Sequence, residues 1–204
     1  MKYKFYMVFI CCLFFNCTTD VSYKVKIKEF QHALNLQFSN PMSSPLNKED
    51  IRTFEFLEFF DINEDYKVNA KLELTPDSPI IEMKTNTERI AYFRKYGIAK
   101  FKINNKDLSL SIYKEEALGK GFDISDNLFL PFKDWTNEVT TYGAGRYINV
   151  GYPDLGESTI EIDFNKAYNP YCVYNNDFSC PFTPSENDLP IEILVGMKTY
   201  RKSH

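Results

Sequence analysis

The sequence contains few of the residues on which common catalytic and metal sites depend. It has two histidines in 204 residues, and His204 is the last residue while His32 falls outside the apolar stripe of a predicted helix. Histidine is the usual base that activates a serine or cysteine nucleophile, and it is a frequent zinc ligand. We therefore expect neither a Ser–His or Cys–His catalytic pair nor a metal site, and we expect no cofactor.

Positive charge is not concentrated anywhere along the chain. Lysine and arginine number 24 against 28 acidic residues, the formal net charge is −4, and no run of basic residues forms a stripe. Nucleic-acid binding therefore has little support. The sequence also shows no fixed-period repeat and no low-complexity tract, and its length is sufficient for a sizeable core. We predict a single β-rich domain over residues 25–204.

The longest apolar run lies at the N-terminus. Two lysines precede Phe5–Phe15, which is too short to span a bilayer and has the length of a signal-peptide core. Cys17 follows at the point where the chain turns polar, and this arrangement resembles a bacterial lipoprotein signal. We expect residues 1–16 to be a signal peptide, Cys17 to be lipidated and residues 17–24 to be a tether. The protein would then be exported and membrane-anchored, on the periplasmic side or at the cell surface. An ordinary cleaved signal and an uncleaved short anchor remain alternatives.

Two cysteines remain in the predicted mature domain, Cys172 and Cys180. An even pair in an exported protein predicts a disulfide. Such a bond would close a loop of about nine residues and contribute roughly 2.5 kcal/mol in the chain-entropy model. A zinc site is the weaker alternative, because seven intervening residues are not a usual zinc spacing.

The apolar pattern predicts helices first and strands afterwards. Apolar residues three or four apart indicate an amphipathic helix over Val25–Phe38, and Asn47 is a suitable N-cap for a short helix through Arg52. Period-two alternation then predicts these strands: Tyr66–Leu74, Ile80–Lys84, Ile90–Lys95, Ile98–Ile103, Leu108–Ile112, Leu128–Phe132, Tyr147–Val150, Thr159–Phe164 and Ile191–Met197. No long helix separates them, so the strands should be antiparallel. The expected fold is mainly β, an antiparallel sandwich or partly closed barrel of eight or nine strands with one N-terminal amphipathic helix and a short second helix.

Arg146 is the most distinctive candidate for ligand contact. It follows Gly143 and Gly145 at the start of a predicted strand, and no other cation lies between Lys133 and Lys166. A guanidinium can bind a carboxylate or phosphate with two parallel hydrogen bonds. The alternative is a buried structural pair with a nearby aspartate.

The segment from Asp163 to Asn187 is the second candidate region. It is rich in tyrosine, asparagine and proline, so we interpret it as a long ordered excursion that folds back over the strand of Arg146 and forms one polar pocket. Three carboxylates, Asp134, Asp163 and Glu186, raise the possibility of acid–base chemistry. For Glu186 the alternative is a helix capping box that starts at Thr183.

Two stretches resemble a known family. PFKDWTNEVTTYGAGRYINV and IDFNKAYNPYCVYNNDFSCPFTPSENDLPIEI are similar to the conserved blocks of the domain-of-unknown-function family 1684, and the likeness spans roughly residues 26–200. The chain departs from the family pattern at Glu138, Thr140 and Asp188, so no role is carried over to those positions. The resemblance implies one shared structural unit, and free thiols as the alternative to a disulfide, because many relatives resemble cytoplasmic proteins. The ligand-binding candidates are Arg146, Asp134, Thr136, Tyr142, Asp163, Asn165, Asn169, Glu186 and Asn187.

The family carries no established activity, so the function rests on the residues. We expect an envelope lipoprotein that binds an anionic small molecule or a glycan in a polar pocket centred on Arg146. A hydrolase-like enzyme using two carboxylates and a purely structural envelope protein are the alternatives.

Overall fold

The computed structural model describes residues 22–116 and 126–201. The predicted signal peptide, Cys17 and most of the predicted tether lie outside these ranges. The elements are α1 (Tyr23–Ser39), α2 (Asp50–Thr53), β1 (Lys67–Leu74), β2 (Ile80–Lys84), β3 (Ile90–Ile103), β4 (Lys106–Glu115), β5 (Leu128–Phe132), β6 (Arg146–Val150) and β7 (Thr159–Asp163), with short 3-10 turns η1 (Glu64–Tyr66), η2 (Phe164–Lys166), η3 (Tyr171–Val173) and η4 (Ser185–Asn187).

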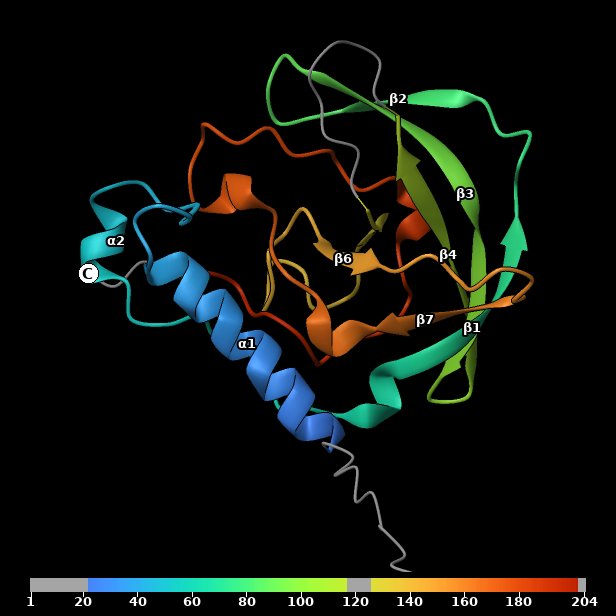
Figure 1. Cartoon of the computed structure of the whole chain (residues 1–204), viewed down its shortest axis with the longest axis horizontal. Helices are drawn as coiled ribbons and strands as arrows, with labels where there is room; N and C mark the ends of the chain where they lie inside the picture. The colour runs from blue at the N-terminus through green and yellow to red at the C-terminus, as the bar shows by residue number, and fades with distance from the viewer. Residues whose placement is uncertain (1–21, 117–125, 202–204) are drawn as a thin grey trace, which may run out of the picture.

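All seven described strands belong to one antiparallel sheet with the order β6-β5-β4-β3-β1-β7, and β2 pairs with β3 outside this path. The sheet curls into a half-barrel, while α1 and the excursion after β7 lie on one side of it (Figure 1). The predicted mainly β, partly closed antiparallel architecture is confirmed. The open seam lies between β6 and β7, whose residues line a common polar hollow of about 420 Å³.

The strand count is lower than the predicted eight or nine for two reasons. The predicted strands Ile90–Lys95 and Ile98–Ile103 are one strand, β3, which continues through a bulge between Lys95 and Gly97. The predicted strand Ile191–Met197 has the expected alternating burial but joins no sheet. Its backbone carbonyls are instead bound by a side chain, described below.

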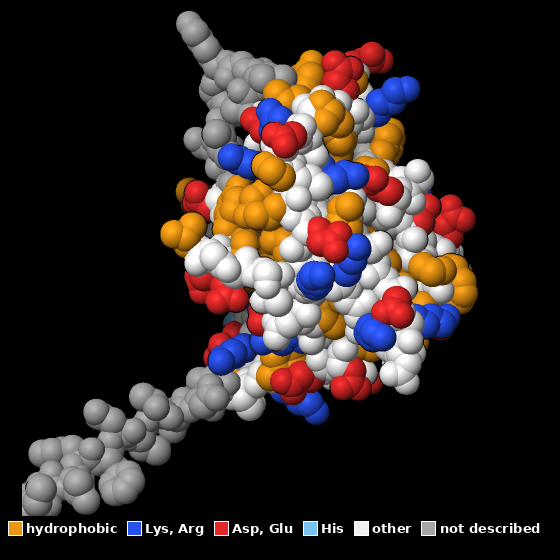
Figure 2. Space-filling view, turned by 90° about the vertical axis from the view of Figure 1, so that its right-hand side faces the viewer, with side chains coloured by type: hydrophobic (Ala, Val, Ile, Leu, Met, Phe, Trp, Pro, Cys, Tyr) orange, Lys and Arg blue, Asp and Glu red, His pale blue; other side chains and the backbone are white. Residues whose placement is uncertain are grey.

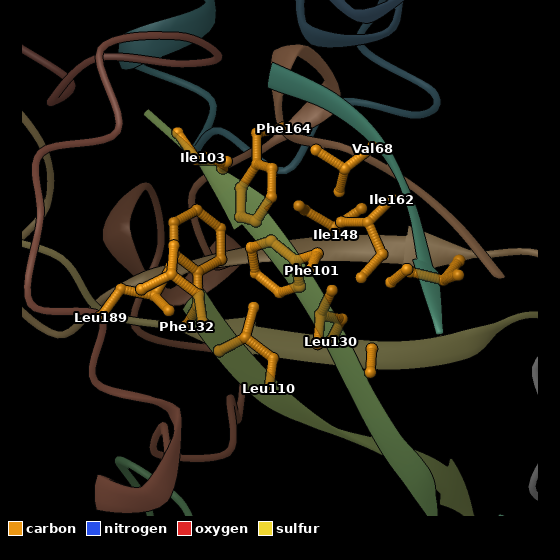
Figure 3. Close-up of a cluster of buried hydrophobic side chains, with 14 of the residues drawn as sticks. Val68, Phe101, Ile103, Leu110, Leu130, Phe132, Ile148, Ile162, Phe164 and Leu189 are labelled. Carbon is orange, nitrogen blue, oxygen red and sulfur yellow. The ribbon is translucent and has the colours of Figure 1, made fainter. Parts of the chain in front are cut away.

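The main core fills the concave side of the half-barrel. Phe101, Phe132 and Phe164 lie at its centre, with ring centroids of Phe132 and Phe164 5.2 Å apart (Figure 3). The residues that alternate inward from β1, β4, β5, β6 and β7 complete it. Burial of this much apolar surface is the main force that holds the sheet in its curl.

A second core joins α1 to the excursion. Phe38 of α1 is buried against Phe54 and Tyr174, with centroid distances of 5.9 and 4.7 Å. The predicted amphipathic helix and short second helix are both present. Asn47 Oδ1 accepts the backbone N–H groups of Glu49 and Asp50, which is the expected N-terminal cap.

The surface carries no field of one sign on the face seen in Figure 2. There, lysine and arginine side chains alternate with aspartate and glutamate, and hydrophobic side chains form patches between them (Figure 2). None of the helices within residues 22–116 and 126–201 is long and apolar enough to cross a bilayer.

Candidate functional site

Arg146 is completely buried and its hydrogen bonds go to the protein itself. Nη2 donates to Asp134 Oδ2 and to the Ile193 carbonyl, both at 2.9 Å, and Nη1 donates to the Val195 and Met197 carbonyls at 2.6 and 3.3 Å. Its terminal carbon lies 5.2 Å from the centre of a core phenylalanine ring. Burial lowers the pKa of Arg146 and the Asp134 carboxylate opposes that shift, so the guanidinium stays charged.

This geometry corrects the expectation that Arg146 centres a ligand pocket. Side chains alternate between the two faces of a strand. In β6, Arg146 points inward, whereas its neighbour Tyr147 points toward the excursion. The excursion does fold back over β6, because the backbones of Tyr147 and Tyr168 exchange two hydrogen bonds. It covers the face that carries Tyr147, so the alternative interpretation, a buried structural pair with Asp134, is the one that the structure supports.

The turn that follows β5 holds the carboxylate of this pair in place. Asp134 Oδ1 accepts the backbone N–H and the hydroxyl of Thr136, and also the backbone N–H of Ile193 at 3.3 Å. The Thr136 hydroxyl continues the network to Thr141 at 2.8 Å. Tyr142 comes next along the chain and is half-buried, and burial raises its pKa. Its carbonyl accepts a hydrogen bond from the Asn137 side-chain amide at 2.8 Å, so these residues hold the turn together.

Asp163 and Asn165 tie the end of β7 to the approach to β1. Asp163 Oδ1 accepts the backbone N–H of Asn165 at 3.0 Å and the hydroxyl of Tyr23, in α1, at 2.9 Å. The Asn165 amide exchanges two hydrogen bonds with the backbone of Asn63. Burial and the Asp163 carboxylate raise the pKa of Tyr23. Two predicted ligand residues thus connect segments about a hundred positions apart in the sequence.

Glu186 and Asn187 fasten the excursion to β4. The Asn187 amide bonds both backbone groups of Ser111 and the carbonyl of Pro131. Glu186 accepts from the hydroxyl of Tyr113 and from Lys95 Nζ, the latter at 2.8 Å. Burial acts to raise the Glu186 pKa, but the hydrogen bonds from Lys95 and Tyr113 outweigh it and lower that pKa. The predicted capping box is wrong, because the Glu186 carboxylate binds Lys95 and Tyr113 of the sheet.

Asn169 completes this set from inside the excursion. Its side-chain amide donates to the Lys198 carbonyl at 2.8 Å and to the Tyr174 hydroxyl at 3.3 Å. The predicted site residues therefore form separate sets of hydrogen bonds that hold irregular segments against the sheet. Asp134, Asp163 and Glu186 each have internal partners, and they do not meet in one cleft.

A groove of about 580 Å³ lies on the other face of the sheet, between α1, the excursion and strands β3, β5 and β6. Phe129 and Tyr147 project into it because their neighbours Leu128, Leu130 and Ile148 occupy the core face. The excursion is pinned at both rims, to β6 through Tyr168 and to the end of β2 through hydrogen bonds of residues 180–182. The groove is therefore framed by ordered backbone on each side.

Aromatic rings line this groove continuously. Phe93 stacks on Phe129 with centroids 5.1 Å apart, Phe129 meets Tyr147 edge-on at 4.7 Å, and Tyr147 meets Tyr168 edge-on at 6.0 Å. Tyr171 adds a further wall from the excursion. Burial raises the pKa of Tyr147 and of Tyr168, so both phenols are neutral at physiological pH.

Two cations line the same groove, and neither has a carboxylate partner among the described residues. Arg89 donates to the hydroxyl and carbonyl of Ser179, both at 2.9 Å, and forms no ion pair with any described residue. Lys166 likewise forms no ion pair within residues 22–116 and 126–201. Glu115 is the one carboxylate among the described lining residues, so the groove has an excess of positive charge.

The two cysteines of the excursion lie together at one side of the groove. Both are free thiols and half-buried, and the backbone N–H of Cys172 donates to Cys180 Sγ at 3.2 Å. Cys180 is among the residues that line the groove, and Cys172 is not. The thiols are thus adjacent as the disulfide prediction requires, and the bond itself stays a prediction.

Sequence reasoning placed the segment Asp163–Asn187 beside a pocket but missed the residues that line the groove with it. Arg89 and Phe93 lie far from this segment in the sequence, and no motif links them to it. A signal was present in β5 and β6, where large aromatic residues occupy positions opposite to the core-facing ones. An aromatic side chain on the outer face of a strand indicates a covered or ligand-binding face.

The fold and the groove together define a half-barrel β protein with an aromatic hollow covered by a long excursion. The chain belongs to a family described as proteins of unknown function (DUF1684), which matches residues 52–198. A similar solved structure is the solution NMR structure of an uncharacterised protein from Haloarcula marismortui, with 28% sequence identity and a TM-score of 0.67, covering 87% of this chain and 94% of that one. A search of curated proteins found no match. The family resemblance predicted from the sequence blocks is confirmed.

Proposed function

We propose that this protein is an envelope lipoprotein whose domain binds an anionic small molecule or glycan in the aromatic groove. The observation that carries the proposal is the continuous floor of aromatic rings flanked by Arg89 and Lys166, two cations that form no ion pair with any residue the structure describes. Concave sites with apolar walls and a few polar groups are the usual form of small-molecule pockets. The ligand would stack a flat ring or sugar face on the aromatic floor and direct its anionic group to the cations.

The internal use of the carboxylates favours binding over the alternative hydrolase. A two-carboxylate mechanism needs both acids at one cleft. Asp134 is bonded to Arg146, Asp163 to Asn165 and Tyr23, and Glu186 to the sheet. None of these three carboxylates is among the residues that line the groove.

Membrane attachment is the second part of the proposal, and it depends on Cys17. Several acyl chains on one cysteine would anchor the protein durably, since each buried methylene contributes about 0.8 kcal/mol. The wild-type protein should fractionate with membranes and take up a labelled fatty acid in the producing bacterium. The Cys17→Ser variant should do neither, and a variant that remains acylated would refute lipidation at this residue.

The binding test uses ligand pairs that differ only in charge. We expect 8-anilinonaphthalene-1-sulfonate to bind the folded protein, and indole-3-acetate to raise its melting temperature more than indole-3-acetamide. Lys166→Met should weaken binding of the anionic members by about two- to fivefold, the range of a partly exposed ion pair. Lys71→Met removes the same charge from an exposed position on β1 outside the groove lining and should leave binding unchanged. Equal effects of the two variants would refute the groove as the anion site.

A further inference from the structure

The paired thiols of the excursion are not equivalent. Cys180 Sγ accepts the backbone N–H of Cys172 at 3.2 Å, so the two cysteines lie side by side. Both side chains are half-buried, and only Cys180 borders the groove.

The surroundings of Cys180 stabilise a thiolate. The hydrogen bond from the Cys172 thiol lowers the pKa of Cys180 to about 7, burial opposes this shift, and the positive charge of Arg89 adds to the lowering. The same thiol–thiol bond raises the pKa of Cys172. A thiolate is the nucleophilic form of cysteine, and such donor-rich, partly exposed surroundings are typical of reactive thiols. The groove gives access to Cys180, and Cys172 lies next to it with its backbone nitrogen 3.2 Å from Cys180 Sγ.

We infer that Cys180 and Cys172 form a redox-active dithiol that exchanges with disulfides entering the aromatic groove, with Cys180 as the attacking thiol and Cys172 as the resolving thiol. The Cys180 thiolate attacks one sulfur of the incoming disulfide, which forms a mixed disulfide and releases one substrate thiolate. Cys172 passes its proton to that thiolate, attacks Cys180 Sγ and releases the second substrate thiolate, which takes a proton from solvent. The protein dithiol is oxidised to a Cys172–Cys180 disulfide, and the substrate disulfide is reduced to two thiols.

This inference depends on the thiols and not on the proposed ligand of the groove. It also gives the predicted disulfide a second meaning, as one of two redox states rather than a permanent crosslink. The groove favours an aromatic, anionic disulfide for the same reasons that it favours an aromatic anion.

The test uses the full-length chain and 5,5′-dithiobis(2-nitrobenzoate), an aromatic disulfide that carries two carboxylates. The reduced wild type should release two equivalents of thionitrobenzoate from this pair and end with Cys172 joined to Cys180, as peptide mapping will show. Cys172→Ser should stop at a stable mixed disulfide on Cys180. Cys180→Ser should react at Cys172 at least about tenfold more slowly at neutral pH, because that thiol is protonated. The wild-type rate should rise with pH to a half-maximum near 7.

Three results would overturn the inference. The first is that the two single variants react at equal rates, which would remove the division of roles. The second is that the folded thiols react only after urea is added. The third is that the pair stays oxidised in a buffer with a large excess of reduced over oxidised glutathione, which is the behaviour of a structural crosslink.

A neutral probe separates this inference from the proposed anion site. We expect 2,2′-dithiodipyridine, an aromatic disulfide without carboxylates, to react equally with the wild type and Lys166→Met. The charged probe should react more slowly with Lys166→Met. Reaction of both probes with no difference between the two proteins would support the dithiol and refute the anion site.

Discussion

Replacing Arg146 by methionine tests whether this residue holds the C-terminal segment in place through its hydrogen bonds. The variant leaves the buried Asp134 carboxylate without its cation and the carbonyls of Ile193, Val195 and Met197 without donors. Removal of one partner of a buried ion pair costs about 3–5 kcal/mol, and each unsatisfied buried acceptor adds about 1–3 kcal/mol. We therefore expect a loss of at least about 5 kcal/mol, which is comparable to the whole stability of many domains.

Urea unfolding provides the measurement. Trp135 is the only tryptophan and directly follows Asp134, so its fluorescence reports on this region. With a slope of about 2 kcal/mol per molar urea, the midpoint should fall by about 2 M or more, or the variant should be unfolded in buffer. Arg52→Met removes an arginine from an exposed site in α2 and should change stability by less than about 0.5 kcal/mol.

A double variant makes the prediction more specific. Asp134→Asn combined with Arg146→Met should cost less than the sum of the two single changes, because neither charge is then left alone. If Arg146→Met lowers the free energy of unfolding by less than about 1 kcal/mol, Arg146 does not hold the C-terminal segment in place, because the loss of a buried ion pair with these partners should cost more.

Three further predictions concern other residues that hold the irregular segments to the sheet. Asn187→Ala removes three buried hydrogen bonds and should lower the melting temperature by about 5–10 °C in a thermal scan. The lowered pKa of Glu186 means that its contribution to stability is present above the unfolded pKa of about 4.3 and is lost as pH falls through the folded value, so Glu186→Gln should differ from wild type at pH 7 and match it below about pH 3. Gly145→Ala should destabilise more than Gly156→Ala in urea unfolding, because both residues have positive φ but only the first Cβ would meet a backbone oxygen, at 2.5 Å.

The sequence predicted the parts of the fold that depend on local pattern. Period-two alternation identified the strands that form the sheet, and apolar spacing identified α1, because burial of one face imposes these patterns directly. The same reasoning found the buried alternation of Ile191–Met197 but assigned it to the sheet. An alternating pattern indicates which side chains are buried, but it does not indicate which groups form hydrogen bonds with the backbone. Here a guanidinium from β6 takes the place of a neighbouring strand.

The site was predicted less well because it depends on which side chains of β6 point to the core and which point to the groove. The excursion does cover β6, as the clustering of tyrosine and proline suggested, yet Arg146 points to the core and Tyr147 to the groove. A shift of one residue moves a side chain to the opposite face. The polar residues that the family blocks emphasise therefore hold irregular segments to the sheet, whereas the groove combines aromatic residues from these blocks with residues from outside them.

The position of the carbonyls bound by Arg146 has a consequence for how the chain matures. Ile193, Val195 and Met197 lie within the last dozen residues of the sequence, whereas the cation that collects them lies about fifty positions earlier. A polypeptide interrupted before residue 193 would have to bury that cation with a single counter-charge and none of these carbonyls, which costs several kcal/mol. The native packing around Arg146 thus requires a chain that extends at least to Met197, and products that stop before Ile193 should be more sensitive to proteolysis.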